Sequence, residues 1–165
     1  MGSEMCIRDS ATAEQVVKHF LDELPERLFS EDAYIVYLQP TSPLRTSEHL
    51  ENAFELMEQK QQHILVSVSE LEKSPFKSFL IDEQGRLQSL FEETMTNARR
   101  QDLPAVFAPN GAIYIFRASD FLSRNAFPSN GGLPFVMSQR DSIDLDSEAD
   151  IARANDILGE KHGRV

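Results

Sequence analysis

The sequence predicts an α/β domain in which strands and helices alternate around a mainly parallel sheet. Residues 33–39 (AYIVYLQ) and 63–69 (HILVSVS) are continuous runs of apolar, β-branched and aromatic residues, as in buried strands, and segments with helical periodicity flank them. With 165 residues, 41% hydrophobic and 26% charged, the chain is long enough for one domain with a sizeable core. This alternation is typical of a sheet covered by helices.

The N-terminal half contains two predicted helices and two predicted strands. Thr12 to Gln15 spells a capping box, and apolar residues then recur at helical spacing until Pro25. The strand at 33–39 follows, and PTSPLRT then forms a turn before a second amphipathic helix. The apolar positions of the two helices are Val16, Val17, Phe20, Leu21 and Leu24, and Leu50, Ala53, Phe54 and Met57.

Residues 71–107 have looser periodicity than the rest. IDEQGRLQSLF resembles a small hairpin with Gln84 and Gly85 near its turn, and the segment is predicted to stand off the main body. Its apolar side chains have no obvious partner there and would form an exposed patch that monomers rarely tolerate. These residues are Phe76, Phe79, Leu80, Leu90 and Phe91.

The C-terminal part returns to alternation. Four further elements are predicted: a strand at 112–116, a short helix at 119–124, a short strand at 135–137 and a last helix from about 147 to 159. Glu148 and Asp150 suit the first turn of that helix.

Composition excludes several classes of protein. A formal net charge of −11 argues against binding to duplex nucleic acid. No apolar run is long enough for a membrane span or a signal peptide, so no membrane association is expected. Cys6 is the only cysteine, so no internal disulfide is possible and a cytoplasmic location is expected. Residues 1–10 lack periodicity and are interpreted as a non-native leader before a domain at 11–165.

Common catalytic motifs are absent. The sequence has no Gly-rich phosphate loop with Lys, no dinucleotide fingerprint and no nucleophile elbow. Its four histidines show no metal-ligand spacing. The motif that begins at Asp144 is not an EF-hand loop, because Ala149 and Asn155 stand where that loop needs glycine and glutamate.

Asp144 and Asp146 form the most informative acidic pair. In an extended segment, residues i and i+2 project to one side, so both carboxylates would face one point while Ile143 and Leu145 face the core. Two hypotheses remain about equal on spacing alone. The pair binds Mg²⁺ together with substrate phosphate, or it solvates a turn before the last helix.

Polar residues also follow the first predicted strand. Gln39, Thr41, Ser42 and Arg45 fall beyond its carboxyl end, where α/β sheets bind ligands. Taken alone, this segment is explained better by an ordinary Pro/Ser/Thr turn that leads into a helix, and PNG at 109–111 is an ordinary tight-turn signal. Lys77, Arg99 and Arg100 either bind an anion or form a solvated surface.

Taken together, these segments resemble the CMP-sialic acid synthetases (acylneuraminate cytidylyltransferases). YLQPTSPLRT, SPFK, RRQDLP, PNGAIYI and DSIDLDSEAD occur in the order and spacing of that family, over nearly everything from residue 11 to the last helix. The resemblance implies a three-layer, Rossmann-like nucleotidyltransferase fold. It also implies transfer of CMP from CTP to a nine-carbon ulosonic acid such as N-acetylneuraminate, with pyrophosphate released and Mg²⁺ assisting.

The resemblance also implies a role for each matching residue. Asp144 and Asp146 would bind Mg²⁺, with Gln39 and Ser42 on the sugar side of the cleft. The acyl-sugar pocket would be lined by Asn110, Tyr114 and Phe127. Residues 71–107 would be a dimerisation arm that carries Lys77 and Arg100 to the sugar carboxylate in the other subunit of a homodimer.

The sequence departs from the family pattern at three places. Ala108 stands where Arg is frequent, and Pro128 where a second aromatic is common, so the sugar stays open and legionaminate or pseudaminate are alternatives to sialate. Nothing matches the family's first strand and its Pro-Ala-Arg-Gly-Gly-Ser-Lys loop for CTP phosphates. The chain is therefore expected to be about the C-terminal two thirds of such an enzyme. It would be either catalytic or a non-catalytic fragment that keeps the sugar pocket and the dimer contacts.

Overall fold

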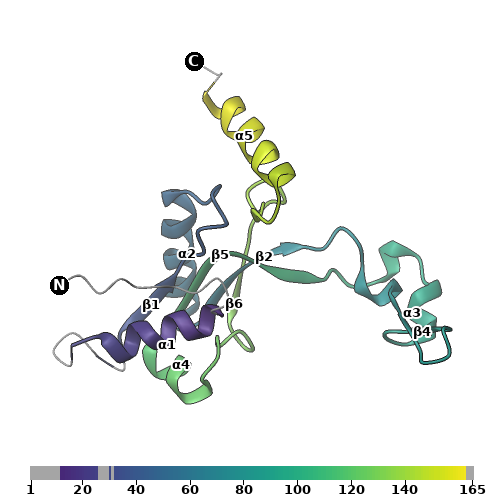
Figure 1. The fold of residues 1–165 in the computed structure, drawn as a ribbon. Helices are drawn as coiled ribbons and strands as arrows, with labels where there is room; N and C mark the ends of the chain where they lie inside the picture. The colour runs from purple at the N-terminus through teal and green to yellow at the C-terminus, as the bar shows by residue number, and fades with distance from the viewer. Residues whose placement is uncertain (1–11, 26–29, 31, 163–165) are drawn as a thin grey trace.

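A computed structural model describes residues 12–25, 30 and 32–162 (Figure 1). Four strands form its main sheet. Two further strands pair separately as a hairpin. The order across the main sheet is β1 (Tyr34–Tyr37), β5 (Phe107–Arg117), β2 (Leu65–Glu70) and β6 (Leu133–Val136). The predicted α/β class is confirmed.

Strand direction follows the prediction only in part. β2 and β6 are parallel, and β1 shares their direction because β1 and β2 both pair antiparallel with β5. The prediction of a mainly parallel sheet was therefore wrong for β5. The physical reason is the connection: the chain leaves β2 at Glu70, crosses the arm and returns at Phe107, which pairs with Glu70. Periodicity reports burial of a strand and not its direction.

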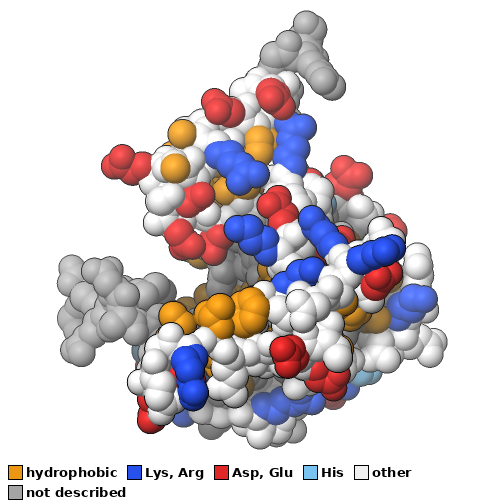
Figure 2. All heavy atoms as spheres, turned by 90° about the vertical axis from the view of Figure 1, so that its right-hand side faces the viewer, with side chains coloured by type: hydrophobic (Ala, Val, Ile, Leu, Met, Phe, Trp, Pro, Cys, Tyr) orange, Lys and Arg blue, Asp and Glu red, His pale blue; other side chains and the backbone are white. Residues whose placement is uncertain are grey.

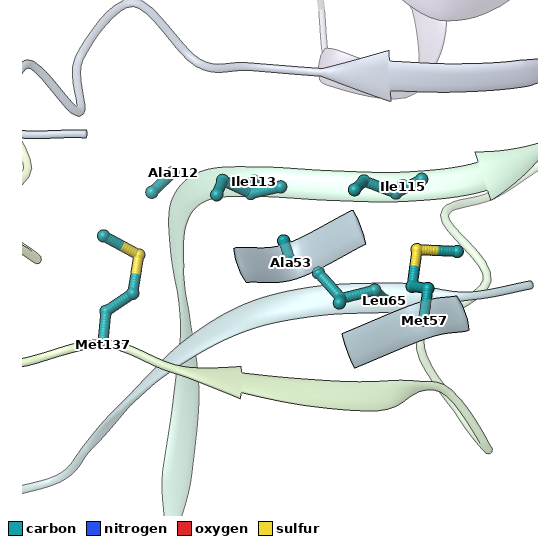
Figure 3. Packing of buried hydrophobic residues seen from close by; sticks show 7 residues of the cluster. All are labelled: Ala53, Met57, Leu65, Ala112, Ile113, Ile115 and Met137. Carbon is teal, nitrogen blue, oxygen red and sulfur yellow. The ribbon is translucent and has the colours of Figure 1, made fainter. Parts of the chain in front are cut away.

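Helices cover both faces of the sheet, so the expected three layers are present. Side chains alternate along β5, as in any strand. Ile113 and Ile115 pack with Ala53 and Met57 of α2 (Ser47–Lys60) on one face (Figure 3). Phe116 packs on the other face against α1 (Ala13–Glu23) and α4 (Ala118–Arg124).

The helix starts agree with the sequence signals. Thr12 accepts a hydrogen bond from the Gln15 amide, and the Gln15 side chain accepts one from the Thr12 amide, which completes the predicted capping box. Thr46 and His49 form a second capping box at α2. The last helix, α5 (Glu148–His162), begins one residue later than predicted and continues beyond Gly159.

β1 is not the buried strand that its apolar sequence predicted. Tyr34 is 44% exposed and Val36 is 38% exposed, while Ile35 and Tyr37 are half-buried on the side of α1 and α4. Within the part of the chain that the structure describes, β1 has one neighbouring strand and lies at the edge of the sheet. An apolar run therefore occupies an edge position, which strands of this composition seldom do.

Residues 71–107 form an arm that stands away from the sheet (Figure 1). The predicted hairpin is confirmed: β3 (Phe79–Ile81) pairs antiparallel with β4 (Leu87–Ser89), and Gly85 has a φ of 79° at the turn. Asp82 accepts hydrogen bonds from the Arg86 and Gln84 amides, which lower its pKa. Three short helices in the arm were missed: η2 (Pro75–Lys77), α3 (Glu93–Asn97) and η3 (Arg100–Asp102).

Two other predicted boundaries shift. β6 begins at Leu133, two residues before the predicted strand at 135–137, and α4 begins at Ala118. The interpretation of residues 1–10 as a leader concerns residues outside the described part. No helix among the described residues is both long and apolar enough to cross a bilayer.

Candidate active site

The site is built around an irregularity in β5. Val66 pairs with Tyr114 and Val68 pairs with Pro109, so residues 110–113 lie opposite the single residue Ser67. PNG was expected to be a tight turn, but the strand continues through it as a bulge. Gly111 has a φ of 75°, which glycine adopts at little cost.

The bulge provides a docking surface for the loop that follows β1. The Gln39 amide donates to the Gly111 carbonyl (3.2 Å), and Ser42 Oγ donates to the Asn110 carbonyl (3.1 Å). A Cβ at position 111 would overlap Gln39 Oε1 and come within 3.0 Å of Ser42 Oγ, so the close approach requires glycine. The loop that carries Gln39 and Ser42 is thereby fixed on β5.

The Arg45 side chain also joins this loop to β5. Its Nη1 donates to the carbonyls of Ala112 (2.7 Å) and Gln39 (3.3 Å). Partial burial of the guanidinium lowers its pKa. Both of these contacts of Arg45 are with backbone of the protein, so its observed contacts are structural.

Asp144 and Asp146 lie on a segment tied to this loop. The Leu145 amide donates to the Thr41 carbonyl (2.9 Å), which joins the two segments side by side. Ile143 is buried and packs with Leu44 and Ala154 of α5, and Leu145 packs against the same cluster. Both Asp side chains are exposed, so the expected alternation of apolar residues inward and carboxylates outward is observed.

The pair of carboxylates suits a magnesium ion. No group of three or more His, Cys, Asp or Glu side chains with metal-site geometry occurs in the described part of the chain. Mg²⁺ does not require one, because it prefers oxygen ligands and usually takes one or two carboxylates with water and phosphate oxygens. Two exposed aspartates, two residues apart, can provide such ligands.

Aromatic side chains cover the α1 and α4 face beside the bulge. The Phe127 ring lies 5.0 Å from the Tyr114 ring and 5.2 Å from the Tyr37 ring, centroid to centroid. Burial raises the pKa of the Tyr114 hydroxyl, with smaller contributions from Tyr37, Glu14 and Asp144. Burial, followed by Glu14, also raises the pKa of Tyr37. The burial of both rings therefore favours the neutral form of both phenols.

The structure brings some of the predicted site residues together and leaves others apart. The loop with Gln39 and Ser42, the bulge at Asn110 and the Asp144 segment are linked by hydrogen bonds at one end of the sheet. Tyr114 follows the bulge on β5 and packs with Phe127. Lys77 and Arg100 are both exposed and lie in the arm, in the short helices η2 and η3.

Burial limits what two of these residues can contact. Ser42 is 0% exposed and Asn110 is 8% exposed. Asn110 Oδ1 accepts from Ser67 Oγ (2.6 Å) and from the Ala112 amide (3.2 Å), and Nδ2 donates to Ser142 Oγ (2.8 Å). The observed contacts of both residues hold the bulge, its loop and the Ser142 turn together.

Arg100 also borders a cavity of about 490 Å³ at the base of the arm. The cavity is lined by Glu70, Leu71 and Ser74 on one side and by Arg100, Gln101 and residues 103–106 on the other. Leu71 and Val106 close the base through a backbone hydrogen bond (2.8 Å). Arg100 therefore lies where the arm meets the sheet. Lys77 is not among the residues that line this cavity.

Sequence reasoning missed Ser67 and Ser142. Ser67 is 0% exposed in the middle of β2, and Ser142 lies two residues before Asp144. The signal for Ser67 was a hydroxyl inside an otherwise apolar strand, HILVSVS, because a buried polar group requires a partner. No comparable signal marked Ser142.

No family model matches the chain, but several known proteins are similar to it. Over 146 residues it is 32% identical to an N-acylneuraminate cytidylyltransferase of Streptococcus agalactiae, which aligns with 86% of the chain. Relatives that are 27–32% identical over most of this chain carry the name N-acylneuraminate cytidylyltransferase, which supports a relationship to that family. The chain is also 28% identical over 156 residues to a Legionella pneumophila protein named CMP-N,N'-diacetyllegionaminic acid synthase.

The alignments cover most of this chain but only part of its relatives. The aligned region is 33% of the streptococcal cytidylyltransferase and 66% of the Legionella synthase. A Helicobacter pylori protein, 30% identical over 138 residues, is named as both a pseudaminic acid cytidylyltransferase and a hydrolase, and 26% of it is covered. The chain therefore spans about a third of the length of the streptococcal relative.

Proposed function

We propose that this chain forms the acidic-sugar and metal-binding part of a cytidylyltransferase that activates a nine-carbon ulosonic acid. CTP would react with the anomeric hydroxyl of the sugar to give CMP-sugar and pyrophosphate. The observation that carries the proposal is the link between the Gln39–Ser42 loop and the Asp144 segment, made by the Leu145–Thr41 hydrogen bond. It places the proposed sugar-binding loop beside the proposed metal-binding segment.

The proposed metal ligands are Asp144 and Asp146. Mg²⁺ held there would neutralise charge on the triphosphate as pyrophosphate leaves. The protein itself contributes the position of the two carboxylates. The buried side chain of Ile143 and the hydrogen bond from Leu145 hold the segment in place, and both acids are exposed. A local cation is also needed because both substrates are anions and the chain carries a net charge of −11.

The proposed sugar pocket lies beside the bulge. Gln39 is half-buried on the docked loop and can present its amide, whereas Ser42 and Asn110 would act mainly by fixing that loop. Tyr114 and Phe127 would provide an apolar wall for the acyl group, since their rings are in contact. Legionaminate and pseudaminate are alternative substrates because proteins named for both sugars are similar to this chain.

We also propose a homodimer in which the arm reaches a second subunit. The space-filling view onto the side from which the arm projects shows hydrophobic side chains at the surface with Lys and Arg side chains close by (Figure 2). Phe79, Leu80, Leu90 and Phe91 are 44–54% exposed, although Phe91 contacts Phe76 within the arm. A two-fold pair would bury this surface twice. Lys77 and Arg100 would then meet the sugar carboxylate of the partner subunit.

A non-catalytic role of the isolated chain is the second candidate. Its sequence contains no Gly-rich loop with a basic residue that could cradle triphosphate. Loss of one stabiliser of transition-state charge typically costs about 2.7–4 kcal/mol. Sugar binding without turnover of CTP would therefore support this alternative for the isolated chain. The single-cysteine composition favours the cytoplasm as the place of either function.

The test compares the isolated chain with a complete family enzyme that carries these residues. Pyrophosphate release would be measured with CTP, Mg²⁺ and sialate, legionaminate or pseudaminate in turn. In the complete enzyme, Asp144→Asn or Asp146→Asn should reduce turnover at least about 100-fold, with folding unchanged because both side chains are exposed. Asp141→Asn, which alters an acid bound by Ser138 Oγ (2.8 Å), is the control and should have a smaller effect.

Wild-type rates in the Asp144 and Asp146 variants across a magnesium titration would refute the metal site. Turnover of none of the three sugars by the complete enzyme would refute the substrate class. Turnover by the isolated chain at the rate of the complete enzyme would refute the non-catalytic alternative.

A further inference from the structure

A chain of hydrogen bonds crosses the sheet from β2 to the proposed metal segment. It begins at Ser67, passes through the Asn110 side chain and ends at Ser142, two residues before Asp144. Ser67 and Asn110 are both buried, at 0% and 8% exposed. Buried polar groups are retained in a fold when they are hydrogen-bonded, and a satisfied network fixes the position of its members.

Backbone groups determine the direction of every bond in this chain. The Ile113 amide can only donate, so Ser67 Oγ accepts from it (2.6 Å) and its own proton goes to Asn110 Oδ1 (2.6 Å). The Ala112 amide also donates to Oδ1 (3.2 Å), which fixes the orientation of the Asn110 amide. Nδ2 must then donate to Ser142 Oγ, whose proton goes to the Ser138 carbonyl (2.7 Å).

The Ser67 side chain also makes hydrogen bonds where the bulge interrupts strand pairing. Residues 110–113 lie opposite this one residue, so regular pairing between β2 and β5 is interrupted there. The hydroxyl of Ser67 accepts the Ile113 amide proton and donates to the Asn110 side chain. A side chain without a hydroxyl at position 67 would leave a buried amide and a buried carbonyl oxygen without one of their partners.

We propose that Ser67 is a positioning residue for the Asp144–Asp146 segment, acting through Asn110 and Ser142. The Ser138–Ser142 turn is fixed at its end by Asn110 Nδ2, and the chain then continues directly into Ile143 and Asp144. The consequence of this positioning for catalysis rests on the proposed function, because only a metal at the two aspartates would make their position matter for turnover.

The test measures amide hydrogen exchange in the 165-residue chain by NMR. The reporter is the Leu145 amide, which lies between the two aspartates and donates to Thr41. The reference is the Ala118 amide, which donates to the Ala33 carbonyl (2.9 Å) at another part of the sheet. Ser67→Ala should accelerate Leu145 exchange about tenfold more than Ala118 exchange, which corresponds to the net loss of one hydrogen bond.

Two further variants make the result specific. Ser69→Ala removes a hydroxyl from the same strand, two residues on, and should leave both amides unchanged. Ser142→Ala breaks the same chain of bonds from its half-buried end, so it should accelerate Leu145 even if Ser67→Ala fails to fold. Acceleration of Leu145 no greater than that of Ala118 in both Ser67→Ala and Ser142→Ala would overturn the proposal.

A titration with Mn²⁺ separates this inference from the proposed function. Paramagnetic broadening of amides 143–147 should occur in the wild-type chain, be lost in Asp144→Asn and need several-fold more Mn²⁺ in Ser67→Ala. If Mn²⁺ broadens none of these amides in any variant, the metal site is wrong and hydrogen exchange alone decides the role of Ser67. If Asp144→Asn weakens Mn²⁺ binding but Ser67→Ala does not, the metal site stands and Ser67 has no positioning role.

Discussion

The bulge of β5 buries polar side chains, whereas the arm exposes apolar side chains. At the bulge, Ser42, Ser67 and Asn110 are buried, and every one of them is hydrogen-bonded within the chain. In the arm, Ile81 is 75% exposed and Leu87 is 69% exposed, on a hairpin that pairs with no other strand of the described chain. The bulge therefore has internally satisfied polar contacts, whereas the arm exposes the kind of surface that another molecule covers.

This difference separates two kinds of functional requirement. A site that must hold two carboxylates in a fixed place needs contacts that are complete before substrate arrives. A surface that joins subunits needs contacts that are left open until the partner arrives. Changes at the bulge should therefore alter the stability of the single chain, and changes in the arm should alter association.

The largest effect is expected at Asn110. Asn110→Ala would leave the Ser67 hydroxyl and the Ala112 amide without their shared acceptor, and Ser142 would lose a donor. The free energy of unfolding should fall by about 3 kcal/mol, measured by chemical denaturation. Asn97→Ala is the control, because Asn97 is exposed in the arm, and its effect should stay within about 0.5 kcal/mol. Equal effects of the two variants would show that the network adds nothing to stability.

In the arm, Ile81→Glu should weaken association and leave the single chain stable. The unfolding free energy should change by no more than about 0.5 kcal/mol, while the dimer dissociation constant should rise about 30-fold, equivalent to about 2 kcal/mol at an interface hot spot. Gln59→Glu adds the same charge on the exposed surface of α2 and should change neither. Sedimentation analysis gives the measurement, and a monomeric wild-type chain across the tested concentrations would contradict the role of the arm.

Two glycines allow a direct comparison of the regions. Gly111 and Gly85 have nearly the same φ, 75° and 79°, but a Cβ at Gly111 would meet Gln39 and Ser42 whereas a Cβ at Gly85 meets nothing within 4 Å. Gly85→Ala should cost about 1 kcal/mol of unfolding free energy from backbone strain alone. Gly111→Ala should cost about 1 kcal/mol more, because the Gln39 side chain must move. Equal costs would mean that the loop with Gln39 and Ser42 moves aside at no cost in free energy.

The smallest effect concerns pH. Burial raises the pKa of Tyr114 above 10.0, so the unfolded chain releases this proton at lower pH than the folded chain. Between pH 10 and the raised value, the folded state binds more protons than the unfolded state, and stability therefore falls as pH rises. Tyr114→Phe should make that alkaline decrease shallower in denaturation curves. An identical slope in the variant would show that Tyr114 ionises equally easily in both states.

The amino-acid sequence by itself determined the α/β class, the helix starts and the separate arm. Thr12 with Gln15 was enough for the start of α1, because a capping box is a contact between near neighbours in the chain. The hairpin around Gly85 was likewise found from turn chemistry. The outward position of Asp144 and Asp146 followed from the two-residue period of an extended segment.

Only the tertiary structure decided how distant segments meet. The sequence could not show that β5 runs antiparallel between β1 and β2, because the period of apolar residues is the same for both directions. It could not show that β1 lies at an edge, since burial depends on which strands are neighbours. Nor could it join Ser67 to Asn110, 43 residues farther along the chain, or Asn110 to Ser142, another 32 residues on. Hydrogen bonds between such residues exist only after the sheet has formed, and the position of the two aspartates depends on them.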